Sequence, residues 1–317
     1  MTDAAAPGLR ARIRARLPLY RKPAILGLSI FGLVLFAWLM LYTPAEPDFR
    51  SVVGFDAFAY WNVDPFHPYG IPLGEFGSFT YTPAFALVSS PAHLLPFWLF
   101  FVLYDSFLVV LFVWLTGRMG WVWLAFLFVP LELYHGNVHI LLAAVCVLGF
   151  EYPALWSIGL LTKVTPGVAL LWFVVRREWR ALAMALGATA AITAVSIVIA
   201  PSAWCDWMNF LTASSSAGPQ VNGSYEYLIP PLWLRMGVAV VLMVWGARTD
   251  RRWVVPVAVA VSMPVIWPIT PAILTAIPRL RKEASLAAHE PFGASAASAA
   301  SAASTAAAPL VDAGSTL

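Results

Sequence analysis

An aspartate surrounded by aromatic residues is the first feature of the sequence that could do chemistry. Asp56 stands in the segment Gly-Phe-Asp-Ala-Phe-Ala-Tyr-Trp, residues 54–61, and Tyr81 follows in a Tyr-Thr-Pro sequence. Aromatic faces stack on the C–H surfaces of sugars, while a carboxylate accepts hydroxyl protons. The segment therefore suits a carbohydrate site. The alternative is an aromatic belt at a membrane interface with acidic residues that are simply solvated.

A lysine within an apolar stretch is the second candidate. Lys163 lies in Leu-Thr-Lys-Val-Thr-Pro, residues 161–166. A charge near the middle of a membrane segment costs at least ~2.5–3.5 kcal/mol on insertion scales, so it usually faces a polar cavity, a partner or an anionic ligand. The alternative is an internal ion pair, for example with Asp105 or Glu132.

Metal and cofactor chemistry find little support in the sequence. Glu132, His135, Asn137 and His139 form a polar island between two apolar runs, but their spacing matches no zinc signature. A polar turn with satisfied hydrogen bonds is the favoured interpretation. We expect no metal, no cofactor and no nucleic-acid partner.

The usual motifs of soluble enzymes are missing from the sequence. It contains no GxxxxGK[ST], GxGxxG, HExxH, GxSxG or Asp-x-Asp motif. ATP-driven transport and nucleotide-sugar chemistry both lose support. The two cysteines, Cys146 and Cys205, form neither a disulfide framework nor a CxxC site.

The composition predicts that membrane helices must position these residues. Of 317 residues, 61% are hydrophobic and 11% are charged, and the mean hydropathy is +0.78. A soluble domain carries roughly 25% charged residues. Long apolar runs must be helices in lipid, because lipid offers the backbone no hydrogen bonds. The sequence thus predicts an all-α, polytopic transmembrane bundle of roughly nine to ten helices with short helices in its outer loops. The predicted spans are 24–42, 83–95, 97–117, 121–134, 138–150, 153–175, 181–201, 229–247 and 253–278.

The distribution of charge predicts the topology. Residues 1–23 carry a cluster of Arg and Lys and should be a cytoplasmic N-terminus, followed by a retained first helix. The acidic segment 43–82 and the segment 202–228 should be outer loops. Three further basic clusters should face the cytoplasm: Arg176 to Arg180, Arg248 to Arg252, and Arg279 to Lys282.

The end of the chain departs from this regular alternation. The prolines of 253–278 should divide that stretch into two half-helices that return to the cytoplasm. The Ala/Ser-rich residues 283–317 should form a disordered cytoplasmic tail, which leaves 24–282 as the membrane domain.

Taken in order, these motifs resemble the polyprenol-phosphate-mannose-dependent α-(1→2)-mannosyltransferases of glycosyltransferase family 87, which have the GT-C membrane fold. The resemblance runs from about residue 50 to residue 235. The matching residues are Asp56 with Tyr60, Tyr81-Thr82-Pro83, loosely Gly136 to His139, Lys163 to Pro166, and faintly Asn222-Gly223-Ser224 with Arg235. The sequence also departs from the family. Residues 264–270 keep a Pro and a Trp of a late motif but lack its two histidines, and the chain is shorter than usual.

The resemblance implies transfer of a hexose, mannose in the first place, from a polyprenyl-phosphate donor to a glycolipid or glycan acceptor on the outer face of the cell membrane. Asp56 would be the catalytic base, and Lys163 and Arg235 would bind the donor phosphate. Tyr60, Tyr81 and Asn222 would contact the sugar or the acceptor. If every predicted span crosses the membrane, residues 136–139 lie near the cytoplasmic side, so this turn is expected to be structural.

Three alternatives stay open at this point. The chain could be a lipid or sugar transporter or flippase, a non-catalytic assembly subunit of the membrane, or an inactive member of the family.

Overall fold

The computed structural model describes residues 53–72, 75–124, 126, 128–216 and 229–289, together with residues 27, 30 and 34. Most of the first predicted span, Asn222 and the tail beyond residue 289 lie outside the described residues. Every regular element in these ranges is a helix, which confirms the all-α fold. The elements, with 3₁₀ helices written as η, are α2 (Phe55–Asn62), α3 (Pro83–Ser89), η1 (Ser90–Leu94), α4 (Phe97–Thr116), η2 (Gly117–Met119), α5 (Gly120–Leu124), α6 (Phe128–His135), α7 (His139–Leu148), η3 (Pro153–Leu155), α8 (Trp156–Thr162), η4 (Thr165–Leu170), α9 (Leu171–Arg176), α10 (Trp179–Ile199), α11 (Pro201–Ser216), α12 (Leu232–Arg248), α13 (Val254–Ser262), η6 (Thr270–Ala276) and α14 (Ile277–His289).

Two of the described helices are long and apolar enough to cross a membrane. They are Phe97–Met119 and Trp179–Ile199, each with a mean hydropathy of 2.2. A third span results if the bent pair α6 and α7 is counted as one. These helices are consistent with a helical membrane bundle. Most of the other predicted spans in the described part are built from shorter pieces.

Proline and glycine explain where the apolar runs break. Pro91 and Pro166 each stand at the start of a 3₁₀ helix, where a residue without an N–H group is tolerated. Gly136 has φ +65°, and at this point α6 and α7 meet at an angle of 108°. A mean hydropathy does not show the angle at which the chain bends at such a residue.

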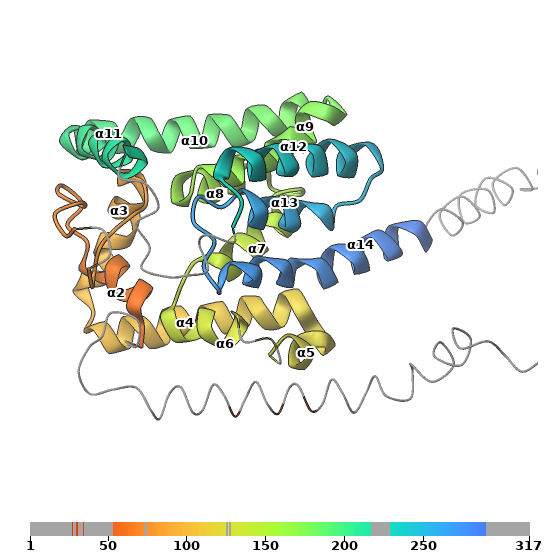
Figure 1. Ribbon diagram of the computed structural model, residues 1–317, viewed down its shortest axis with the longest axis horizontal. Helices are drawn as coiled ribbons and strands as arrows, with labels where there is room; N and C mark the ends of the chain where they lie inside the picture. The colour runs from red at the N-terminus through yellow and green to blue at the C-terminus, as the bar shows by residue number, and fades with distance from the viewer. Residues whose placement is uncertain are drawn as a thin grey trace, which may run out of the picture.

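The bundle has two ends, and α4 runs from one to the other (Figure 1). Different residues gather at each end. At one end, Phe97 lies 5.2 Å from the ring of Phe58 on α2. At the other end, the guanidinium of Arg279 lies 4.8 Å over the ring of Trp114. We call the first the α2 end and the second the arginine end.

The segment 153–176 makes a hairpin between these two ends and is not a single crossing. Its middle reaches the α2 end, where the hydroxyl of Thr82 donates to the carbonyl of Leu161. Its C-terminal part returns to the chain just before its start, because the ring of Trp172 packs 5.2 Å from the ring of Phe150. Lys163 follows the last residue of α8 and therefore stands at the tip of this hairpin.

The three basic clusters gather at the arginine end. Arg176 Nη1 lies 2.8 Å from Asp250 Oδ1, which joins the first cluster to the second. Arg252 and Arg279 line one cavity, which joins the second cluster to the third. The chain therefore leaves this end in α13 and returns to it in α14, with the expected proline break between residues 262 and 270.

The predicted outer loop 202–228 begins as a helix. The described part of this range belongs to α11, which turns away from the axis of α10 at the α2 end (Figure 1). The ring of Phe210 on α11 stacks on Tyr69 at 5.1 Å. The helix therefore packs against the acidic segment of the first predicted outer loop.

Candidate active site

Asp56 lies in the first turn of α2, and the start of this helix is fixed by Gly54. Gly54 has φ +73°, a left-handed conformation that glycine adopts without strain. Its amide donates to the carbonyl of Tyr134 on α6 at 2.7 Å. A Cβ atom here would lie 3.0 Å from the rings of Phe97 and Phe101. The glycine thus lets α2 approach both α4 and α6.

The turn between α6 and α7 approaches α2 equally closely. A Cβ atom on Gly136 would lie 2.8 Å from Cβ of Ala57, a distance that real side chains do not adopt. Together with its positive φ, this contact explains why a glycine occupies the position. The turn is held against the residue that follows Asp56.

Asn137 connects this turn to Asp56 directly. Its Oδ1 accepts a hydrogen bond from the amide of Val138 at 2.7 Å, which orients the side-chain amide. Its Nδ2 therefore faces the other way and donates to Asp56 Oδ2 at 2.7 Å. Because Oδ1 is held by a backbone N–H, the amide cannot be turned over without losing a bond.

The contact corrects the expectation that residues 136–139 lie far from Asp56. That expectation counted 83–95 as a crossing, whereas this segment consists of the seven-residue α3 and the five-residue η1. With one crossing fewer, the turn falls at the α2 end. Sequence reasoning left Asn137 out of the site for this reason, although its place in a Gly-Asn turn was a usable signal.

A buried pair of Glu132 and His139 stabilises the turn between α6 and α7. Glu132 Oε1 accepts hydrogen bonds from the backbone amides of His139, at 2.5 Å, and Ile140, at 3.2 Å. Glu132 Oε2 lies 2.9 Å from Nδ1 of His139, and neither side chain is exposed. A carboxylate at this place also interacts favourably with the N-terminus of α7. The polar turn is thus satisfied by its own residues, except for Nε2 of His139, which has no partner among the described atoms.

Tyr60 and Tyr81 pair beside Asp56. Their hydroxyl oxygens are 2.8 Å apart, and their rings meet edge to face at 5.3 Å. Both side chains are buried, with exposed fractions of 2% and 4%. Tyr60 is four residues after Asp56, so the two share one face of α2.

Lys163 reaches the same cluster from the tip of its hairpin. Its Nζ lies 5.5 Å from the centre of the Tyr81 ring. It forms no ion pair within the described part of the chain, neither with Asp105 nor with Glu132. The side chain is half-buried, and its ammonium group lies beside Tyr81 without a carboxylate of the described residues in contact.

The electrostatics favour a carboxylate that takes up protons readily. Burial raises the pKa of Asp56 above its ordinary value. The positive potential of His135, the hydrogen bond from Asn137 and the charge of Lys163 oppose this rise. Asp56 is half-buried, and is therefore neither in open water nor sealed from solvent. Burial also raises the pKa values of Tyr60 and Tyr81, so both hydroxyls stay protonated.

Arg235 is not among the contacts of this cluster. Its guanidinium is buried and donates to four backbone carbonyls: Pro230 at 2.8 Å, Val261 at 3.1 Å, Met263 at 2.5 Å and Pro264 at 3.0 Å. These bonds hold the chain at the end of α13, where helix carbonyls lack partners within the helix. Asn222 belongs to the residues that are not described. Within the described ranges, no group of three or more His, Cys, Asp or Glu side chains is placed to hold a metal ion.

The comparison with protein families adds a separate observation. Residues 79–234, slightly less than half of the chain, match the model of glycosyltransferase family 87. The match indicates a glycosyltransferase. The matched range contains Tyr81, Asn137 and Lys163, while Asp56 and Arg235 lie outside it. Neither a curated protein nor a solved structure matches the chain significantly.

Proposed function

We propose that this protein is a membrane glycosyltransferase of the family 87 type. It transfers a hexose, with mannose as the first candidate, from a polyprenyl-phosphate donor to a glycolipid or glycan acceptor on the outer face of the cell membrane. One observation supports this proposal above all. Asp56, Asn137, Tyr81 and Lys163 come from four separate segments and meet at one end of an apolar helical bundle.

A lipid-linked donor agrees with the construction of the site. The sugar is already tethered to the bilayer, so a nucleotide-binding domain is not needed. The leaving group is a polyprenyl phosphate, which develops negative charge as the anomeric C–O bond breaks. Lys163 would supply a positive charge that no carboxylate of the described residues contacts, and this charge would stabilise the departing phosphate.

Asp56 would act as the base in a single displacement with inversion. The acceptor hydroxyl oxygen forms a bond to the anomeric carbon, and its proton passes to Asp56. The bond from that carbon to the phosphate oxygen breaks, and its electron pair stays on the phosphate. A raised pKa makes a carboxylate a better proton acceptor near neutral pH, provided it is still ionised. Asn137 would keep Asp56 ionised and correctly oriented.

Tyr60 and Tyr81 would shape the pocket for the sugar. Their rings pack against each other at 5.3 Å, so only part of each aromatic surface is available for stacking. The departure at residues 264–270, where both expected histidines are missing, lies in the segment that Arg235 fixes. We infer that this segment has a structural role in the present chain.

A transfer assay tests the proposal. Membranes containing the protein are incubated with polyprenyl-phosphate mannose labelled in the sugar, and the label is followed into lipid and glycan fractions. Transfer that depends on the protein supports the proposal. Movement of the label across the bilayer without transfer would instead indicate a flippase. If the label is neither transferred nor moved, the protein is an assembly subunit. The same membranes are also incubated with polyprenyl-phosphate glucose, which tests the preference for the sugar. A further incubation with a nucleotide sugar tests the class of donor.

A further inference from the structure

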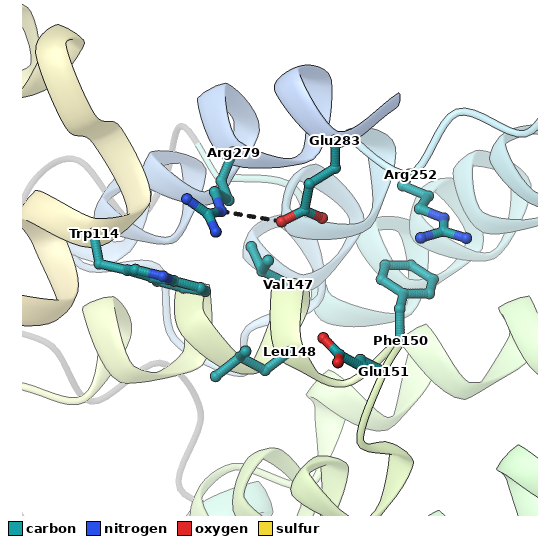
Figure 2. Close-up of a pocket in the computed structure, with 8 residues that line it drawn as sticks. All are labelled: Trp114, Val147, Leu148, Phe150, Glu151, Arg252, Arg279 and Glu283. Atoms are coloured by element: carbon teal, nitrogen blue, oxygen red, sulfur yellow. Dashed lines mark hydrogen bonds and ion pairs between the residues drawn. The ribbon is translucent and has the colours of Figure 1, made fainter. Parts of the chain in front are cut away.

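A polar cavity lies at the arginine end, away from Asp56. It has a volume of about 360 Å³ and is enclosed by α4, α7, α14, the turn after α7 and the loop before α13. Figure 2 shows Arg279 and Arg252 on opposite sides of this cavity, with Glu283 between them. The chemistry proposed above uses none of these residues.

Both arginines are held by aromatic rings. Arg252 lies 4.8 Å over the ring of Phe150, and Arg279 lies 4.8 Å over the ring of Trp114. A stacked guanidinium keeps its in-plane N–H groups available for a ligand. Nε of Arg279 donates to Oε1 of Glu283 at 3.0 Å, which leaves its terminal N–H groups for a ligand. Arg252 forms no ion pair with any described residue. The cavity therefore presents N–H donors of two fixed guanidinium groups.

The acidic residues restrict what these donors can bind. Glu283 and Glu151 also line the cavity, so its formal charges cancel. A small anion with several negative charges would meet repulsion from both carboxylates. A ligand with one phosphate and one ammonium group matches the arrangement, because Glu151 is exposed and forms no ion pair with the described residues. Its carboxylate interacts with the hydroxyl of Tyr152, which leaves its negative charge uncompensated.

The apolar surroundings indicate that such a ligand carries acyl chains. Val147 and Leu148 form part of the cavity wall. On α4, Val110 and Val113 are exposed by 64% and 56%, and they lie four residues and one residue before Trp114. This helix is apolar enough to span a membrane, so these valines face hydrocarbon in the bilayer. An apolar path thus leads along α4 to a polar cavity at the end of the helix, where lipid headgroups lie.

We propose that this cavity binds the headgroup of a zwitterionic phospholipid with a primary ammonium group. Its phosphate contacts Arg252 and Arg279, its ammonium group contacts Glu151, and its acyl chains lie along α4. The basic clusters at this end indicate the inner leaflet. The site does not depend on the proposed transferase activity.

Lipid binding to the purified, delipidated full chain in detergent tests this site. Phosphatidylethanolamine, phosphatidylglycerol and phosphatidylcholine are added separately, and bound lipid is counted by native mass spectrometry alongside the unfolding temperature. We expect phosphatidylethanolamine to bind in a one-to-one complex and to raise the unfolding temperature more than the other two. Equal or stronger effects of phosphatidylglycerol would overturn the proposal, as would displacement of the lipid by inorganic phosphate.

Variants locate the binding to the cavity. Arg252→Gln is expected to weaken binding of phosphatidylethanolamine by about tenfold, since it removes charge-assisted hydrogen bonds. Arg251→Gln is the matched control, because Arg251 stacks on Trp245 and does not line the cavity. Glu151→Gln changes only an exposed side chain and should reduce the preference for phosphatidylethanolamine over phosphatidylglycerol. Unchanged affinity and preference in both variants would place the lipid elsewhere.

Discussion

Nδ2 of Asn137 donates to Oδ2 of Asp56 at 2.7 Å, across a sequence separation of 81 residues. The bond stabilises the ionised carboxylate, whereas burial of Asp56 disfavours it. The protonation state of Asp56 therefore depends in part on a residue of another segment.

Asn137→Ala should change the pH dependence of sugar transfer. Without the amide donor the pKa of Asp56 rises further, and a base works only when it is ionised. The acid limb of kcat/KM should therefore move to higher pH, with activity partly recovered in alkaline buffer. Asn209→Ala, on the exposed side of α11, is the control. An unshifted profile would show that Asn137 does not tune Asp56.

Asp56→Asn should abolish most of the transfer while the protein stays folded. General base catalysis contributes about 10²- to 10⁴-fold, and the amide cannot take the proton. The measurement is the initial rate with labelled donor, at equal amounts of membrane-inserted protein. Asp64→Asn is the matched control, because its side chain is 56% exposed and contacts the backbone amide of Phe66 and the ring of His67 in its own loop. Wild-type rates in Asp56→Asn would remove Asp56 as the base.

Lys163→Gln should weaken the use of the lipid donor. Removal of a charge at the departing phosphate is expected to lower kcat/KM for the donor by about tenfold or more. Lys163→Arg should retain part of the activity, because it keeps the charge. Lys282→Gln, at the arginine end, controls for the overall charge of the protein. An unchanged donor dependence would argue against a phosphate contact.

Gly136→Ala should destabilise the protein and misplace the site. The left-handed conformation alone costs a residue with a Cβ atom about 1–2 kcal/mol, and the contact with Ala57 adds to this. Thermal unfolding in detergent measures the loss. Gly187→Ala on α10 is the control, because nothing lies within 4 Å of its Cβ position, and it should be neutral or stabilising. Equal unfolding temperatures of the two variants would contradict the close approach.

The two tyrosines should behave as a coupled pair. Tyr60→Phe leaves the Tyr81 hydroxyl without its partner in a buried place, and Tyr81→Phe does the same to Tyr60. Each change should cost about 1–3 kcal/mol of unfolding free energy, whereas the double variant should cost less than the sum. A double-mutant cycle from unfolding measurements gives the interaction free energy between the two hydroxyl groups. Strict additivity would mean that the hydroxyls do not interact.

Much of the fold and part of the site follow from the sequence. Scarcity of charge and long apolar runs are sufficient to predict an all-α bundle. The spacing of Asp56 and Tyr60 already places both on one helical face. A lone cation in an apolar segment needs a polar environment, which makes Lys163 a candidate from the sequence. The structure places its Nζ beside the Tyr81 ring, and its role in binding the donor stays a prediction.

The rest could not be predicted for physical reasons. Hydropathy measures how apolar a segment is, and it does not show whether that segment crosses the bundle or is divided into short helices. The predicted position of Asn137 was wrong because 83–95, counted as one crossing, consists of the short helices α3 and η1. The resemblance assigns Arg235 to the donor phosphate, but its guanidinium binds backbone carbonyl groups, and such carbonyl groups carry no signature in the sequence.

The hairpin that carries Lys163 also affects how the chain is inserted into the membrane. A lysine in the middle of a straight spanning helix would have to pass through the translocon into lipid with its charge uncovered. Since the segment 153–176 begins and ends at the arginine end, its tip can instead pack against helices that precede it in the chain and are already inserted. Substitutions at the base of this hairpin, where Phe150 packs on Trp172, should therefore lower the yield of inserted protein before they affect turnover.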